Sequence, residues 1–229
     1  MKIKICGLFR EEDIEAANEA GPDFIGFVFA PSRRRIRAEE AARLRRRLSP
    51  DIIPVGVFVN APIAEIAALY REGIITLAQL HGGEDGAYTA ALKAACGIPV
   101  IRAVRVETGN DLAPWQEASL GPQAGDAENA PGPVHTARPD ADYLLFDRGG
   151  GTGKAFDWRI LEKFRTFGAF RAPCFLAGGI DGNNIEKALS FKPFGIDVSS
   201  GAETGGVKDR EKMIYLTEKA HRYEYRLES

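Results

Sequence analysis

The first 29 residues, MKIKICGLFREEDIEAANEAGPDFIGFVF (1–29), contain one complete strand–helix–strand unit. A short apolar run (2–6) is followed by a segment with helical spacing (11–20) and then by a second apolar run (23–29). Most strand-like runs of this chain, including 23–29, are nearly continuous in apolar residues rather than alternating, which is typical of parallel strands covered on both faces. The stretch therefore predicts a parallel βαβ unit.

The same alternation continues along the rest of the chain. The further strand-like runs are 52–59, 75–80, 98–104, 142–147, 173–179 and 194–200. The further amphipathic segments are 38–48, 62–73, 86–96, 157–164, 183–190 and 209–225. Pro62 lies near a helix start, and Gly21, Gly73 and Gly97 lie at helix ends, where these residue types are favoured. Eight strands alternating with helices predict an α/β fold, a single (β/α)8 TIM barrel domain spanning 1–229.

One region breaks the alternation. Residues 108–140 are rich in Gly, Pro and Ala and lose their periodicity after Leu120. Long irregular loops inside compact domains are uncommon and are usually functional or disordered. We expect a short helix followed by a flexible insertion at about 121–140.

Composition excludes several classes of protein. The chain is 45% hydrophobic and 27% charged, with a net charge of −2, so it carries no overall positive field to attract nucleic acid. No apolar run is long enough to cross a bilayer, and we expect a cytoplasmic protein without a membrane partner. The cysteines are too few and too dispersed for a disulfide framework or a zinc site, being Cys6, Cys96 and Cys174.

Barrel enzymes carry their active residues at the carboxyl ends of strands. The side chains at these positions are Cys6, Arg33, Arg34, Arg35, Gln79, His81, Asp147, Asp197, Ser199 and Ser200. Asp147 is either a general acid or base or an ordinary capped carboxylate. Cys6 is either a catalyst or a buried structural thiol, and His81 is either a ligand contact or a structural histidine.

Two glycine-containing turns follow the last two strands. Gly178 and Gly179 precede one helix, and Ser200 and Gly201 precede the final helix, so their N–H groups suit a phosphate. The alternative is that these glycines only permit tight turns. A third stretch, GGGTGK (149–154), fails the nucleotide P-loop pattern and is either a closing loop or a connection.

Taken together, the motifs resemble the phosphoribosylanthranilate isomerase family of tryptophan biosynthesis. The matching stretches are KICG (4–7), GFVFAPSRRR (26–35), VGVFVN (55–60), QLHG (79–82), LLFDRGGGTGKAFDW (144–158), LAGGI (176–180) and DVSSGAE (197–203). The resemblance implies a (β/α)8 isomerase that performs an Amadori rearrangement of N-(5-phosphoribosyl)anthranilate, a small-molecule substrate, with no cofactor and no metal. It leaves a monomer and a homodimer equally open.

The resemblance also implies roles for individual residues. Asp147 would be the general acid that opens the ribose ring, and Cys6 the general base that removes the C2′ proton. Arg35 would bind the anthranilate carboxylate and Asp197 would lie near its amine. The phosphate site would come from Gly178, Gly179, Ser200 and Gly201. Gln79 and His81, at the end of the strand over 75–80, are two further candidate substrate contacts.

Other readings stay open. The loop after the second strand reads APSRRRI, which departs from the family pattern and leaves Arg34 as an alternative to Arg35. A related sugar-phosphate barrel is the alternative enzyme, either the histidine-pathway aminoaldose isomerase or a ribulose-phosphate epimerase. The former normally ends its first strand in aspartate, and the latter relies on metal-binding histidines. A non-catalytic phosphate-binding barrel is the alternative outside enzymes.

Overall fold

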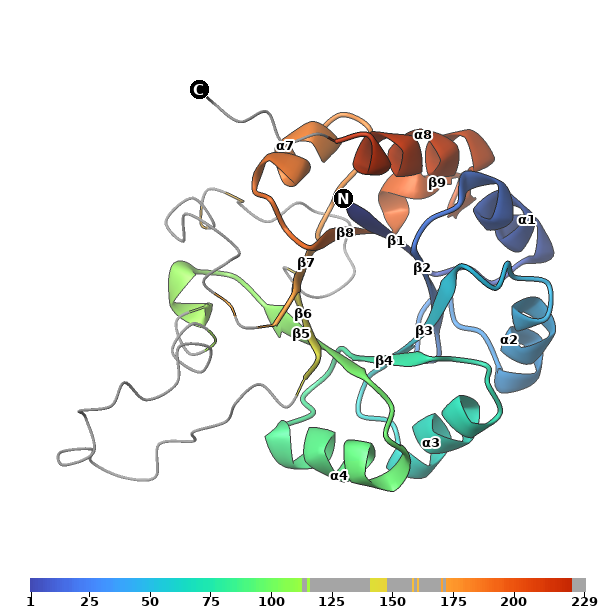
Figure 1. The fold of residues 1–229 in the computed structure, drawn as a ribbon, viewed down its shortest axis with the longest axis vertical. Helices are drawn as coiled ribbons and strands as arrows, with labels where there is room; N and C mark the ends of the chain where they lie inside the picture. The colour runs from blue at the N-terminus through green and yellow to red at the C-terminus, as the bar shows by residue number, and fades with distance from the viewer. Residues whose placement is uncertain are drawn as a thin grey trace, which may run out of the picture.

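Eight parallel strands close into a barrel in the computed structural model of this chain, and helices surround it (Figure 1). The structure describes residues 1–112, 115, 141–147, 158, 160, 170 and 172–223. The strands are β1 Lys2–Cys6, β2 Phe24–Val28, β3 Ile53–Phe58, β4 Leu77–Leu80, β5 Val100–Arg105, β6 Tyr143–Asp147, β7 Cys174–Leu176 and β8 Gly195–Val198. The predicted fold is confirmed.

The helices follow the strands in chain order. They are α1 Glu11–Ala20, α2 Ala38–Arg45, α3 Ile63–Arg71, α4 Gly86–Cys96, α7 Ile185–Ser190 and α8 Arg210–His221. Gly21 and Gly97 end α1 and α4 in the left-handed conformation, with φ of 63° and 73°, which glycine adopts without strain. None of the helices among the described residues is long and apolar enough to cross a membrane.

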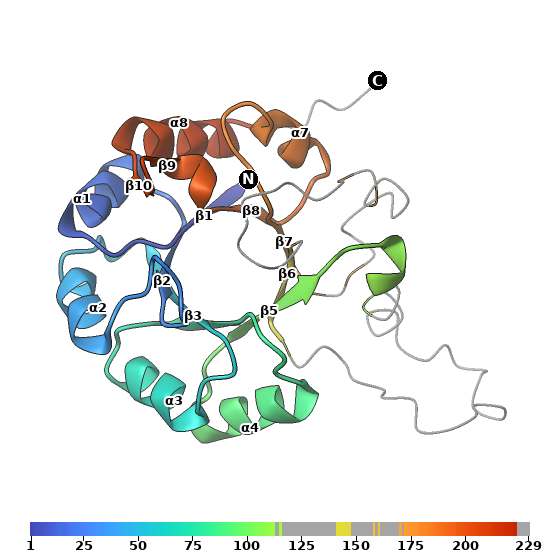
Figure 2. The same cartoon turned by 180° about the vertical axis from the view of Figure 1, so that it is seen from behind.

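The barrel closes where β1 pairs with β8, so its first and last strands lie side by side. Lys4 lies opposite Asp197 and Ile5 opposite Val198 in this pairing. Helix α8 lies beside α1 in both views, and the Met1 amino group donates a hydrogen bond to the Ala220 carbonyl at 3.0 Å (Figure 2). This closure places residues from both ends of the sequence at one part of the rim.

Strand side chains divide between two apolar layers because successive residues point to opposite faces. The barrel interior contains Phe24, Val55, Leu77, Ile101, Leu145, Phe175 and Ala177. The alternate residues, such as Ile3, Ile5 and Ile25, pack outward against the helices. Lys4 lies opposite Phe24 in the β1–β2 pairing and therefore shares the inner face, as does Cys6 two residues later.

Several elements differ in detail from the prediction. The chain forms an antiparallel hairpin of β9 (Glu203–Thr204) and β10 (Val207–Lys208) before α8, which no sequence pattern indicated. The first part of the irregular region forms a short 3-10 helix, η1 (Gly109–Asp111). The predicted insertion at 121–140, the glycine stretch 149–154 and most of the predicted helix at 157–164 lie outside the described residues.

Candidate active site

The carboxyl ends of the strands form one rim, and the topology brings the nominated side chains to it. Cys6 ends β1, Asp147 ends β6, and Asp197 is the second-last residue of β8. Gln79 lies near the end of β4, with His81 directly after that strand. Since all eight strands run in parallel, these side chains share one end of the barrel.

Cys6 is buried against a glycine on the neighbouring strand. It pairs with Gly26 of β2, and a Cβ atom at Gly26 would lie 2.7 Å from Cys6 Sγ and 3.2 Å from Lys4 Nζ. No side chain larger than hydrogen fits at this position without displacing the thiol. Burial raises the pKa of the Cys6 thiol, while the positive charges of Lys4 and Lys208 oppose that increase.

Lys4 is a functional candidate that the sequence analysis did not nominate. Its side chain is fully buried, and its ammonium forms a 2.9 Å salt bridge with Asp197. Burial lowers the pKa of Lys4, but Asp197 and Cys6 outweigh that effect and raise it overall, so the amine stays charged. The available signal was a lysine between Ile3 and Ile5, two residues before Cys6 in the first strand-like run.

A second missed cation comes from the hairpin. Lys208 of β10 is buried and donates to Glu203 Oε1 at 2.7 Å and to the Ser199 carbonyl at 3.0 Å. Its charge also acts on Cys6. The Ser199 hydroxyl donates to the Cys6 carbonyl at 3.1 Å, which ties the loop after β8 to the end of β1.

In the arginine cluster after β2, Arg34 points inward, whereas the sequence had led us to expect Arg35. Arg34 binds Glu203 through Nε at 2.6 Å and Nη2 at 3.0 Å, and its Cδ lies within 2.3 Å of the position a Cβ on Gly7 would take. Arg33 also binds Glu203, at 2.6 Å. The Arg35 side chain is exposed, so the structure places Arg34, and not Arg35, beside Gly7.

The opposite side of the site is less enclosed. The Gln79 amide nitrogen lies 2.8 Å from His81 Nδ1, within hydrogen-bonding distance. His81 Nε2 lies 3.4 Å from Asp147 Oδ2. The side chains of His81 and Asp147 are 27% and 17% exposed. Three nominated residues are thus brought together in one chain of contacts.

The two glycine-containing turns pack closely against each other. A Cβ on Gly201 would lie 1.9 Å from the Ile180 carbonyl oxygen, so only glycine fits there. Gly178 and Gly179 have φ of 90° and 67°, and within the described part of the chain their N–H groups donate no hydrogen bond to protein. Unsatisfied N–H groups at a strand end can receive an anion. Ser200 lies in the adjoining 3-10 helix, η3 (Ser200–Ala202).

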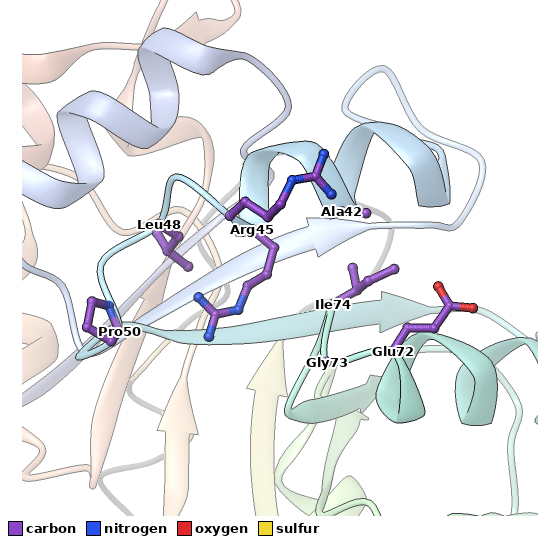
Figure 3. A pocket seen from close by; sticks show the side chains of 8 residues that line it. Ala42, Arg45, Leu48, Pro50, Glu72, Gly73 and Ile74 are labelled. Atoms are coloured by element: carbon purple, nitrogen blue, oxygen red, sulfur yellow. The ribbon is translucent and has the colours of Figure 1, made fainter.

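One groove lies away from these residues. It has a volume of about 540 Å³ and is lined by the C-terminal part of α2 and by the loops that follow α2 and α3 (Figure 3). Its lining includes Arg45, Leu48, Glu72 and Ile74. The loops that follow helices lead into the amino ends of strands, so this groove lies at the rim opposite Cys6. Across the described ranges, no group of three or more His, Cys, Asp or Glu side chains is arranged to hold a metal ion.

Comparison with known proteins matches the whole barrel. The family model of N-(5'-phosphoribosyl)anthranilate (PRA) isomerase matches residues 3–121 and 125–219. An N-(5'-phosphoribosyl)anthranilate isomerase of Endomicrobium trichonymphae is 42% identical over 219 residues, covering 93% of this chain and 94% of that protein. The corresponding protein of Thermoanaerobacter sp. (strain X514) is 38% identical over 220 residues, covering 96% and 97%.

Solved structures give the same result. A crystal structure of phosphoribosyl anthranilate isomerase from Thermus thermophilus superposes with a TM-score of 0.74 at 33% identity, covering 96% of this chain and 98% of that one. Another such isomerase, in complex with reduced 1-(o-carboxyphenylamino)-1-deoxyribulose 5-phosphate, superposes with a TM-score of 0.76 at 29% identity and the same coverage.

Proposed function

Because the chain belongs to the N-(5'-phosphoribosyl)anthranilate isomerase family, we propose that Cys6 and Asp147 carry out the two proton transfers of its reaction. The chain is an isomerase of tryptophan biosynthesis. It rearranges N-(5-phosphoribosyl)anthranilate to 1-(2-carboxyphenylamino)-1-deoxyribulose 5-phosphate. The reaction moves hydrogen within one molecule, so it needs an acid and a base at different atoms and no net oxidant.

Asp147 begins the reaction as a general acid. Its proton passes to the ribose ring oxygen while the bond from that oxygen to C1′ breaks, and the anilino nitrogen lone pair forms the double bond of a Schiff base. The 3.4 Å contact with His81 Nε2 supports this role, because it orients the carboxyl group at the end of β6.

Cys6 completes the reaction as the general base. Its thiolate removes the proton on C2′, and the electron pair of that C–H bond moves through C1′ to neutralise the Schiff base as an enolamine. The enolamine then tautomerises to the ketone by taking a proton at C1′. The observation that carries the proposal is the buried Cys6 thiol beside the Lys4 ammonium, on the same rim as Asp147.

Substrate binding divides between two sets of groups. We assign the anthranilate carboxylate to Arg34 rather than Arg35, because Arg34 alone turns toward Gly7 and is held there by Glu203. The phosphate is assigned to the turns that contain Gly178, Gly179, Ser200 and Gly201, which is where barrel enzymes frequently bind phosphate. A contact between Asp197 and the substrate amine stays a prediction.

Two variants test the assignment of acid and base. Cys6→Ala and Asp147→Asn each should lower kcat at least about a thousandfold while the thermal melt stays cooperative. Turnover is followed by the loss of phosphoribosylanthranilate fluorescence. Near wild-type rates in either variant would remove that residue from the mechanism. Calorimetric binding of the reduced product analogue without turnover in the wild-type protein would instead indicate a non-catalytic barrel.

A further inference from the structure

Lys4 occupies a buried position where a charged side chain is energetically unfavourable unless it is paired. It lies on the inner face of β1, and its side chain is 0% exposed. Burying an ammonium is unfavourable unless a partner compensates for the lost hydration. The register of the barrel supplies that partner, because Lys4 pairs directly with Asp197 across the β1–β8 closure, at 2.9 Å.

The geometry directs the same ammonium toward the thiol. Lys4 and Cys6 are two residues apart on one strand, so both side chains point to the same face. Their polar atoms converge over Gly26, since one point above that residue lies 2.7 Å from Cys6 Sγ and 3.2 Å from Lys4 Nζ. The positive charge of Lys4 acts on Cys6, where it opposes the increase in the thiol pKa that burial causes.

Other charged groups reach Cys6 from β8 and β10. Asp197 carries a negative charge that opposes the thiolate but is paired with Lys4. Lys208 carries a positive charge that favours the thiolate and is itself held by Glu203. The thiol therefore faces two anchored cations and one carboxylate.

We propose that Lys4, anchored by Asp197, is a positioning residue that fixes Cys6 Sγ over Gly26 and stabilises its thiolate, with Lys208 as a weaker second cation. This inference rests on the proposed role of Cys6 as the base. Burial alone would leave almost no thiolate near neutrality, and an opposite charge at this range offsets burial by about 1–3 pKa units. The same burial keeps the thiolate strongly basic once it forms.

The experiment titrates the thiolate directly. The ultraviolet absorbance of the thiolate is followed against pH, and the curve of a matched Cys6→Ser protein is subtracted so that only Cys6 contributes. Lys4→Met should move the midpoint upward by at least about one pH unit, because it removes the cation and leaves Asp197 unpaired. Lys208→Met should move it upward by less. Lys2→Met is the control, since Lys2 lies on the same strand but binds Asp23 at the far end.

A double variant separates the loss of the Lys4 charge from any disruption of folding by the unpaired Asp197. Lys4→Met with Asp197→Asn leaves no uncompensated buried charge, and its midpoint should fall between those of the wild type and Lys4→Met. The rising limb of kcat against pH should shift by the same amount in Lys4→Met, and Lys4→Arg should restore part of the shift.

The outcomes separate this inference from the proposed function. An unchanged Cys6 midpoint in Lys4→Met and in the double variant, with both folded, overturns the role of Lys4 even where Cys6→Ala abolishes turnover. Conversely, a shifted midpoint in a protein whose Cys6→Ala variant remains active establishes the Lys4–Cys6 interaction and refutes Cys6 as the base. A kcat loss in Lys4→Met without any pH shift assigns Lys4 a packing role and also overturns the proposal.

Discussion

The base side and the acid side of the site differ in how completely the protein encloses them. Cys6 and Lys4 are buried, and Asp197 ties Lys4 in place. On the other side, Asp147 and His81 are partly exposed and meet at 3.4 Å. The difference follows from chemistry, because a thiol needs a fixed positive environment to be a base, whereas a carboxyl can exchange protons without one.

The base side also carries a surplus of positive charge. Among the described residues, its ionic groups are four cations and two carboxylates, namely Lys4, Lys208, Arg33, Arg34, Asp197 and Glu203. Glu203 is shared by three of the cations, and its pKa is lowered by hydrogen bonds from Arg34 and Lys208, which outweigh the effect of burial. The surplus favours both a thiolate and a carboxylate-bearing substrate.

The largest effect is expected at Gly26, which packs directly against the Cys6 thiol on the base side. Gly26→Ala would place a Cβ 2.7 Å from Cys6 Sγ and 3.2 Å from the Cys6 Cα, so the thiol must move. A displacement of about 1 Å at a reacting group costs about a hundredfold in rate. We therefore expect kcat to fall about 100-fold to 1000-fold with little change in KM, measured by steady-state fluorescence.

Gly83→Ala is the control for this substitution. Gly83 follows β4 near the same rim, and among the described residues a Cβ there would meet only Asn60 Oδ1, at an ordinary 3.6 Å. Its kcat should equal that of the wild type. An active Gly26→Ala protein would mean that the thiol tolerates displacement, and the base side would then be no more constrained than the acid side.

A smaller effect is expected at the shared carboxylate. Glu203→Gln replaces an oxygen that accepts hydrogen bonds with an amide nitrogen, so Arg34 or Lys208 loses its anchor. We expect KM for phosphoribosylanthranilate to rise about tenfold, which corresponds to one charge-assisted hydrogen bond. Glu40→Gln is the control because Glu40 binds the exposed Arg37. Equal KM values in the two variants would exclude a binding role for the Glu203 network.

Strands and helices were predictable where their hydrophobic patterns extend over five or more residues. The observed β1, β2 and β3 lie within one residue of the predicted runs, and α1 and α4 coincide with them. The β9–β10 hairpin was missed because each of its strands has two residues, which is too short for any periodicity to appear.

The site residues named from sequence were predictable because they lie at or just after the carboxyl ends of strands, which together form the rim of a barrel. The role of Lys4 could not be predicted from sequence. It depends on the β1–β8 register, which places Asp197 opposite Lys4 although the two residues are far apart in the chain. The orientation of Arg34 and Arg35 was also out of reach. They are adjacent in an irregular loop, and a long-range contact with Glu203 decides which one turns inward.

The acid side should respond more weakly than the base side. His81→Gln removes the ring nitrogen that lies 3.4 Å from Asp147 Oδ2 while keeping a polar side chain. We expect kcat to fall about tenfold, since an orienting contact is lost but the carboxyl remains. The Cys6 thiolate titration should not move. A shift in that titration would show that the two sides are coupled rather than independent.

The smallest effect on activity is expected at the far end of β1, where a charge cluster lies away from any chemistry. Asp23 accepts hydrogen bonds from Lys2 at 2.6 Å, from the Ile3 N–H at 2.9 Å and from His221 at 3.0 Å. Burial opposes the charged form, but these partners outweigh it and lower the pKa of Asp23. Asp23→Asn should therefore lower the free energy of unfolding by about 1–2 kcal/mol near neutrality, with unchanged kcat.

The pH dependence of this loss has a definite sign. A carboxyl with a lowered pKa in the folded state stabilises the protein above its unfolded pKa, and that contribution disappears as the pH falls through the folded value. Denaturant unfolding of the wild type and Asp23→Asn should thus differ most near neutrality and converge in acid. A fall in kcat together with stability would show that this charge cluster contributes to activity as well as to folding. A difference in unfolding free energy that grew in acid would contradict a stabilising role for the ionised Asp23.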